Sequence, residues 1–114
     1  MFPKKNRITK TGFDELMKKG RVLHSPSFSL RYSKGVNVLP RFAFVVSKKV
    51  AKNAVDRNIL RRRGFFILRD LGILKQEDLW KGFSGAFFYK KEGKGVKNNE
   101  LKKEIEEILK KLNG

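Results

Sequence analysis

The chain has 114 residues, a length that favours a single domain, and 39% of them are hydrophobic, which is enough for a small core. It carries 28 Lys and Arg against 11 Asp and Glu, and a formal net charge of +17 favours a polyanionic partner, either nucleic acid or an anionic membrane surface. The absence of cysteine excludes disulfides, thiolate catalysis and cysteine-based zinc sites.

The N-terminal segment predicts a basic arm followed by a short helix. Residues 1–10 are basic and irregular, with no apolar h-region of a signal peptide. Thr11 begins a Thr-Gly-Phe-Asp sequence with the form of a capping box, and Phe13 and Met17 follow at helical spacing. We therefore expect a helix over 12–19. No apolar run approaches the roughly 20 residues that span a bilayer, so a soluble cytoplasmic protein is expected.

Three segments predict strands. Residues 27–33 alternate apolar and polar side chains, as in a strand with one wet face. Residues 41–47 are apolar on both faces, which fits a central strand, and Phe42 and Phe44 share one of those faces. A last strand is expected over 85–91. A turn is expected between the first two strands, at Lys34-Gly35 and Asn37.

Two further helices complete the predicted fold. Residues 52–71 form a basic helix, 72–84 form a loop in which Trp80 acts as a packing lid, and Asn99 caps a final helix with one apolar stripe. The order is helix, two or three strands, helix, strand, helix. This order predicts an α+β sandwich, with one sheet and helices packed on it.

The basic helix places its polar side chains on one arc. At about 100° per residue, four of them fall within about 140°: Arg57, Asn58, Arg61 and Arg62. Forked guanidinium donors suit phosphate oxygens. The far side is apolar, interrupted by charges, and is expected to face the core: Val55, Ile59, Leu60, Phe66 and Ile67. A basic helix beside an aromatic sheet is typical of a groove for single-stranded nucleic acid. The alternative is a solvated helix that is basic only because the protein is, and the clustering on one arc argues against it.

The sequence offers no catalytic set. His24 is the only histidine and is expected at the surface or in a turn. The acids Asp70, Glu77 and Asp78 are isolated, and no phosphate-binding loop or zinc-protease motif is present. We therefore expect no catalytic residue in the protein itself.

The segment 47–62, SKKVAKNAVDRNILRR, closely resembles the signature of the bacterial ribonuclease P protein subunit. That family's pattern runs roughly S-K-K, three variable residues, A-V-x-R-N, two residues, then a basic pair; in this chain four residues, 50–53, separate Lys49 from Ala54. The matching positions are Ser47, Lys48, Lys49, Ala54, Val55, Arg57, Asn58, Arg61 and Arg62. The N-terminal arm, the first helix, the flanking strands and the final helix are also similar to the family, so the resemblance covers nearly the whole chain.

The resemblance implies a more specific fold than the pattern does. It implies a single RNA-binding domain, a two-layer α/β sandwich of the α+β class in α-β-β-β-α-β-α order (ribosomal protein S5 domain 2-like). It also implies a left-handed βαβ crossover at the signature helix. General handedness rules predict the opposite hand.

The resemblance also implies a ribonucleoprotein endonuclease. A separate catalytic RNA would remove the 5′ leader of precursor tRNA with Mg²⁺, which is bound mainly by the RNA, and the protein would bind both RNAs but no membrane and no small-molecule substrate. The positions carried over for RNA binding are Ser47, Lys48, Lys49, Lys52, Arg57, Asn58, Arg61 and Arg62, with Mg²⁺ near Asn58. Those carried over for a leader cleft are Phe13, Met17, Phe28 and Phe44.

The chain departs from the family at several positions. Phe65 and Phe66 stand where the family usually has Arg and Glu, so part of the RNA contact is expected to be missing or to shift to Arg63 and Arg69. Met17 stands where an aromatic is common, so stacking of the leader is expected to be weaker.

Three other functions are distinguished from this one by different properties of the sequence or of RNA binding. A non-catalytic RNA-binding protein of the same fold, of the ribosomal or RNA-chaperone type, would bind structured RNA without discriminating leader length. A membrane-surface protein would show a cleaner apolar helix face. A stand-alone nuclease would need an acid/base set that the sequence lacks.

Overall fold

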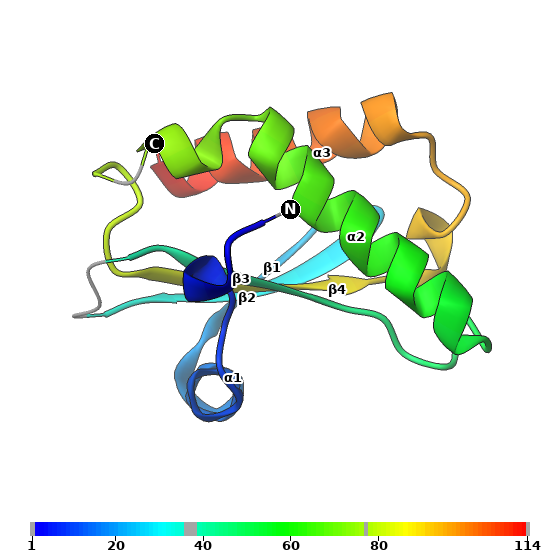
Figure 1. The fold of residues 1–114 in the computed structure, drawn as a ribbon, viewed down its shortest axis with the longest axis horizontal. Helices are drawn as coiled ribbons and strands as arrows, with labels where there is room; N and C mark the ends of the chain where they lie inside the picture. The colour runs from blue at the N-terminus through cyan, green and yellow to red at the C-terminus, as the bar shows by residue number, and fades with distance from the viewer. Residues whose placement is uncertain (1, 36–38, 77, 114) are drawn as a thin grey trace.

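The computed structural model describes residues 2–35, 39–76 and 78–113, so the expected turn residue Asn37 and the acid Glu77 lie outside the described residues. One four-stranded sheet separates two helical layers (Figure 1). Helices α2 (Ala54–Asp70) and α3 (Asn98–Asn113) cover one face, and α1 (Lys10–Lys19) lies across the other. The α+β sandwich predicted from the sequence is confirmed.

The sheet has the strand order β1-β2-β4-β3. Its strands are β1 (Arg21–His24), β2 (Phe28–Lys34), β3 (Arg41–Val45) and β4 (Phe83–Tyr89). β2 is antiparallel to β1 and to β4, whereas β3 and β4 are parallel. The residues of β1 were not assigned from the pattern, because an edge strand of four residues with one partner carries little apolar pattern, although the resemblance implied three strands before the basic helix.

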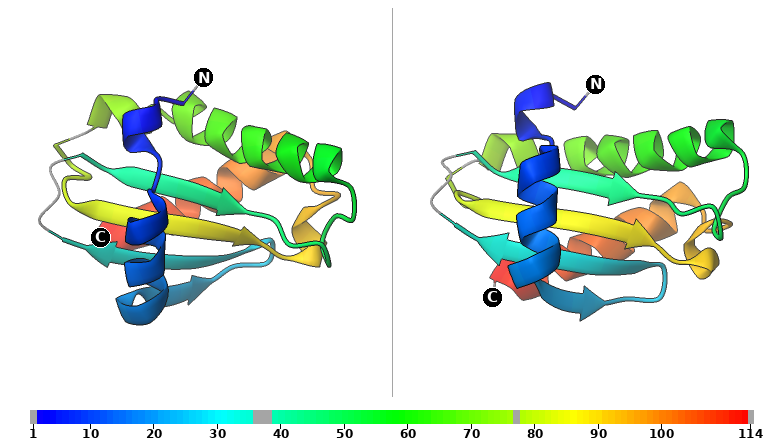
Figure 2. Two further views of the ribbon diagram at one scale, coloured as in Figure 1. Left: turned by 60° about the horizontal axis from the view of Figure 1, so that its bottom comes forward. Right: turned by 90° about the horizontal axis from the view of Figure 1, so that it is seen from below.

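The connection from β3 through α2 to β4 is left-handed. Figure 2 shows β3 and β4 pointing the same way, with α2 running back on the sheet face away from α1. Followed from β3 to β4, this path turns in the sense opposite to nearly all such crossovers. The hand implied by the family resemblance is thus confirmed, and the general rule would have been wrong here.

The core lies between the sheet and the layer of α2 and α3. Aromatic side chains dominate the sheet's contribution to it: Phe28, Phe42, Phe44, Phe83, Phe87 and Tyr89. The Phe44 ring stacks on Phe87 with centroids 4.9 Å apart. Trp80 is buried and meets Phe83 edge-on at 5.1 Å, so it closes the core as predicted. Such contacts add to the stabilisation that comes from burying apolar area.

Helix α2 packs through a stripe that matches the predicted one only in part: Leu60 and Ile67 face the core as expected, and the other three predicted residues do not. Its buried residues are Leu60, Gly64, Ile67 and Leu68, whereas Val55, Ile59 and Phe66 are exposed. The prediction placed the centre of the buried stripe wrongly, because Gly64 lies at that centre and has no side chain to mark it as apolar. The helix is thereby rotated, and a row of three apolar side chains faces away from the core.

The N-terminal segment is not a free arm. Phe2 is buried, Asn6 Nδ2 donates to the Pro40 carbonyl at 2.9 Å, and Ile8 N donates to the Phe42 carbonyl at 3.0 Å. The segment therefore lies along β3, where it covers an edge of the sheet. The docking of this segment was missed because its contacts come from single residues with no regular spacing.

Two predicted helix caps are also corrected. Thr9, not Thr11, is the N-cap of α1, and its Oγ1 accepts from Gly12 N at 3.1 Å. Helix α3 begins at Asn98, and Asn99 Oδ1 accepts from Glu100 N within the first turn. His24 is exposed, on the edge strand β1. Within the described residues, no helix has both the length and the apolar character needed to cross a membrane.

Candidate nucleic-acid interface

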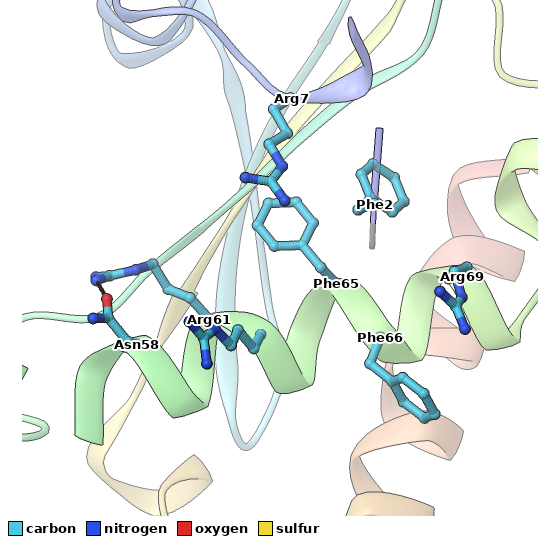
Figure 3. Close-up of a pocket in the computed structure, with 8 residues that line it drawn as sticks. Phe2, Arg7, Asn58, Arg61, Phe65, Phe66 and Arg69 are labelled. Carbon is cyan, nitrogen blue, oxygen red and sulfur yellow. Dashed lines mark hydrogen bonds between the residues drawn. The ribbon is translucent and has the colours of Figure 1, made fainter. Parts of the chain in front are cut away.

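The outward side of α2 carries a row of hydrogen-bond donors, which we call the donor stripe: Asn58, Arg61, Arg62 and Arg69. Figure 3 labels Asn58, Arg61 and Arg69. Asn58, Arg62 and Arg69 recur at helical spacing away from the core stripe, so burial of that stripe turns them outward, and Arg61 lies at its edge beside Leu68. Arg61 is half-buried and the other three are exposed. Of the predicted arc, Asn58 and Arg62 face solvent and Arg57 and Arg61 are half-buried, and Arg69 extends the exposed part.

The donor stripe has no carboxylate partner among the described residues. The ion pairs among the described residues involve other side chains: Lys81 with Asp78 at 3.9 Å and Lys102 with Asp70 at 2.6 Å. Within the stripe, Arg61 Nη2 donates to Asn58 Oδ1, which leaves the amide nitrogen of Asn58 as a donor. A surface of donors and positive charge suits the phosphates of a nucleic acid.

The loop before α2 adds further charge. Val50 and Ala51 are buried and anchor it, while the Ser47 carbonyl accepts from both of their amides at 3.1 Å. This turn leaves the remaining predicted RNA-binding side chains of the loop exposed: Ser47, Lys48, Lys49 and Lys52.

Arg57 has a structural role beside the predicted one. Its Nη1 donates to the Ala51 carbonyl at 3.0 Å and to the Lys52 carbonyl at 2.7 Å. These two bonds hold the basic loop against the first turn of α2. Arg57 thus fixes where the loop lysines stand relative to the donor stripe.

A hollow of about 500 Å³ opens beside the donor stripe (Figure 3). Its lining combines aromatic and cationic side chains: Phe2, Arg7, Asn58, Arg61, Arg62, Phe65, Phe66 and Arg69. The guanidinium of Arg7 lies 5.0 Å from the centre of the Phe65 ring, and that of Arg69 lies 5.8 Å from the Phe66 ring.

The two phenylalanines that depart from the family pattern play different parts. Phe65 is half-buried and packs at 5.1 Å against both Phe2 and Phe44, which makes it part of the wall between hollow and core. Phe66 is 56% exposed. Figure 3 shows Phe65 pointing toward Arg7 and Phe66 pointing away from it. Of the two arginines expected to replace the missing family charge, Arg69 lines the hollow. The other, Arg63, donates from Nη1 to the Val96 carbonyl at 3.5 Å.

Two of the four residues predicted for the leader cleft, Phe13 and Met17, lie on α1, on the side of the sheet away from α2 (Figure 1). Helix α1 places Phe13 with its ring 5.9 Å from that of Phe88, and the Met17 carbonyl accepts from Arg31 Nη1 at 3.1 Å. Met17 is 38% exposed. Val45 pairs with Phe88 across β3 and β4, so both side chains point to the same face.

Phe28 and Phe44 were wrongly predicted to lie in the leader cleft. Their exposed fractions are 0% and 4%, and both face the core beneath α2 and α3. Alternation along a strand shows which residues share a face but not which face is covered. Sequence reasoning did not single out Val45 and Phe88, whose side chains point to the sheet face away from the core. For Phe88 a signal was available, because neighbouring residues of a strand point to opposite faces and Phe87 and Phe88 are neighbours.

The donor stripe does not suit a directly bound Mg²⁺. Magnesium prefers oxygen ligands with negative charge, and the stripe offers guanidinium groups and one amide whose oxygen is already bonded to Arg61. Among the described residues, no group of three His, Cys, Asp or Glu side chains is placed to hold a metal ion. No step of the chemistry is therefore assigned to a metal held by this chain alone.

A buried hydrogen bond fixes α2 to the sheet. The Tyr89 hydroxyl of β4 donates to the Leu60 carbonyl of α2 at 2.8 Å. Burial raises the pKa of Tyr89 above its usual range, and the nearby Arg63 offsets this only in part. The tyrosine remains a neutral donor at physiological pH and holds the middle of the helix that bears the donor stripe.

Comparison with known proteins identifies one family. The family model described as Ribonuclease P matches residues 2–113. The fold is similar to that of the Thermotoga maritima RNase P protein, with 23% identity, 95% of this chain and 98% of that chain covered, and a TM-score of 0.77. It is also similar to the Staphylococcus aureus RNase P protein, with 21% identity, coverage of 92% and 93%, and a TM-score of 0.75. No curated protein sequence matches the chain.

Proposed function

We propose that two sides of this protein bind two different RNAs. The premise is that the chain belongs to the ribonuclease P protein family and is the protein subunit of an endoribonuclease complex that processes tRNA. The donor stripe and the basic loop bind the catalytic RNA. The face of the sheet beside α1 binds the 5′ leader of precursor tRNA.

The donor stripe is the observation that carries this proposal. It presents three arginines and an asparagine on one side of a helix, with no carboxylate partner among the described residues. Three charge-assisted contacts to phosphate fix register and orientation on an RNA more strongly than scattered lysines do. The loop 47–52 extends the same surface toward the end of β3.

The leader is assigned to the other face by shape and chemistry. Phe13, Met17, Val45 and Phe88 form what we call the leader face, an apolar surface with Arg31 beside it. Unpaired bases stack on aromatic side chains, and arginine beside them tracks the backbone. Because this face and the donor stripe lie on opposite sides of the sheet, both RNAs have room to bind at once.

Hydrolysis is assigned to the RNA partner. The protein's own residues bind and orient, and its charge of +17 lowers the repulsion between two polyanions. Mg²⁺ supplies the activated water and charge stabilisation when bound to the RNA. Asn58 and the arginines around it hold the RNA backbone near that region.

The test is 5′ cleavage of a precursor tRNA at low Mg²⁺, with protein alone, catalytic RNA alone, and both together. We expect efficient cleavage only with both, and a preference for substrates that carry a leader. Binding of the RNA without any change in cleavage would overturn the proposal and favour a non-catalytic RNA-binding protein. Cleavage by the protein alone would overturn the assignment of hydrolysis to the RNA.

A further inference from the structure

We propose that the hollow beside α2 takes one unpaired nucleotide of the catalytic RNA, with its base stacked on Phe66 and its flanking phosphates bound by Arg62 and Arg69. This inference rests on the proposed function and names a contact within that interface.

The exposure of Phe66 is the first argument. Helix α2 buries its own apolar stripe against the sheet, yet Phe66 remains 56% exposed on the side that carries the donors. A single exposed apolar side chain is common on protein surfaces. Here, however, the guanidinium of Arg69 lies 5.8 Å from the ring centre, so a cation and a ring are already paired at the mouth of a hollow. Arginine beside an aromatic ring is the arrangement on which unpaired bases stack.

The size and walls of the hollow are the second argument. Its volume of about 500 Å³ lies within the range of roughly 300–1,000 Å³ found for small-ligand sites. Phe2 and Phe65 form an apolar wall, with rings 5.1 Å apart, and Arg7 over Phe65 holds that wall in place. The wall is already formed in the free protein, so a base that enters the hollow would not have to order these side chains.

The spacing of the arginines is the third argument. Arg62 and Arg69 are seven residues apart, about two helical turns or roughly 10 Å along the axis, with Phe66 between them. A cation, a ring and a cation in a row match the phosphate, base and phosphate of a single strand. A base-paired segment would not fit, because its bases are stacked inside the duplex and cannot reach the ring.

The contact is specific to this chain rather than general to the signature. Phe66 occupies a position where the family signature usually has Glu, so a ring replaces a negative charge. Loss of that charge leaves Arg69 with no acidic partner one turn away and available for phosphate. Stacking here would add binding energy that does not depend on salt.

The experiment measures the affinity of the full chain for the ribonuclease P RNA of the same organism, across a series of salt concentrations. The variants are Phe66→Ala, Phe66→Trp and Arg69→Ala, with Ile59→Ala as the matched control. Ile59 is an exposed apolar residue of the same helix, at 48% exposure, that does not line the hollow. Thermal unfolding of each variant shows that the fold is kept.

We expect Phe66→Ala to weaken binding about 5- to 140-fold, the range that base stacking of about 1–3 kcal/mol corresponds to at 1.4 kcal/mol per tenfold. The slope of log K against log salt should not change. Phe66→Trp should keep the affinity, whereas Arg69→Ala should reduce the slope by about 0.7–0.9. Chemical probing should show an unpaired nucleotide that is protected by the wild type and by Ile59→Ala but not by Phe66→Ala.

Equal affinities for Phe66→Ala and Ile59→Ala, or the same nucleotide protection with both, would overturn the nucleotide site while leaving the proposed function intact. Failure of the proposed function looks different. In that case the wild type itself would bind the ribonuclease P RNA no better than a structured RNA of the same length and unrelated sequence.

Discussion

Gly64 of α2 lies directly on the ring of Phe44 of β3. A Cβ at this position would stand 2.4 Å from two carbons of that ring. The ring cannot yield, because it stacks on Phe87 at 4.9 Å and meets Phe65 edge-on at 5.1 Å. The height of α2 above the sheet, and with it the position of the donor stripe, is therefore set by the absence of a side chain at Gly64.

Gly64→Ala should destabilise the protein although alanine favours helices. Overpacking a filled core costs about 1–3 kcal/mol, at the upper end here because three ring atoms lie within 2.7 Å of the new carbon, and the helix propensity gained offsets about 1 kcal/mol of it, which leaves a net loss of about 2 kcal/mol. Denaturant unfolding measures the net loss. Gly95→Ala is the control, since nothing lies within 4 Å of its Cβ, and it should change the free energy of unfolding by less than about 0.5 kcal/mol. If Gly64→Ala is as stable as Gly95→Ala, then α2 can move away from the sheet without loss of unfolding free energy.

The layered fold could be predicted because periodicity reports which side chains share a face. Its hand came only from the family resemblance, since no local pattern distinguishes a left-handed from a right-handed path through α2, and the general preference points the wrong way. The covering of β3 by the N-terminal segment also left no periodic trace. Asn6 and Ile8 make those contacts singly.

The outward side of α2 was easier to predict than the face of the sheet beside α1. Charges cannot be buried cheaply, so an arc holding Arg61 and Arg62 had to face solvent. Aromatics can be either core or platform, and Phe44 and Phe88 look alike in sequence. Only the position of α2 and α3 decides that Phe44 is core and that Phe88 meets α1.

Arg62→Ala should weaken binding of the catalytic RNA more than loss of one charge elsewhere. Loss of a charge-assisted hydrogen bond to phosphate corresponds to about 1.5–3 kcal/mol, or roughly 10- to 100-fold in affinity, and the salt slope should fall by about 0.7–0.9. Lys103→Ala is the matched control, because Lys103 is an exposed cation of α3 away from the donor stripe. Filter-binding titrations at several salt concentrations supply both values. Equal losses in the two variants would show that the protein binds RNA through bulk charge alone.

Met17→Phe should strengthen binding of the leader. Met17 stands 38% exposed on α1, the helix that places Phe13 against Phe88, and a ring there would extend the stacking surface of the leader face. One added base stack is worth about 1 kcal/mol at the low end, or roughly fivefold. The measurement is the ratio of affinities of the reconstituted complex for precursor and mature tRNA. Leu79→Phe, at an exposed site outside the leader face, should leave that ratio unchanged. An unaltered ratio in Met17→Phe would place the leader elsewhere.

Tyr89 should make the wild type lose stability at alkaline pH. Burial raises the pKa of its hydroxyl in the folded state above the ordinary value of about 10, so the folded protein holds the proton more tightly than the unfolded chain. The stability that this provides is complete below pH 10. It declines as the pH rises above 10, by at most about 1.4 kcal/mol per pH unit for one proton.

Tyr89→Phe separates this effect from the titration of the many lysines. The variant should lose about 0.5–1.5 kcal/mol at pH 7, because the hydrogen bond to the Leu60 carbonyl is gone, yet above pH 10 it should fall less steeply than the wild type. Urea unfolding at pH 7 to 11 gives both curves, and Tyr32→Phe, which keeps Tyr89, should retain the steeper loss. Parallel curves for wild type and Tyr89→Phe would mean that the hydroxyl reaches solvent, and that α2 is held to the sheet by apolar packing around Gly64 rather than by this bond.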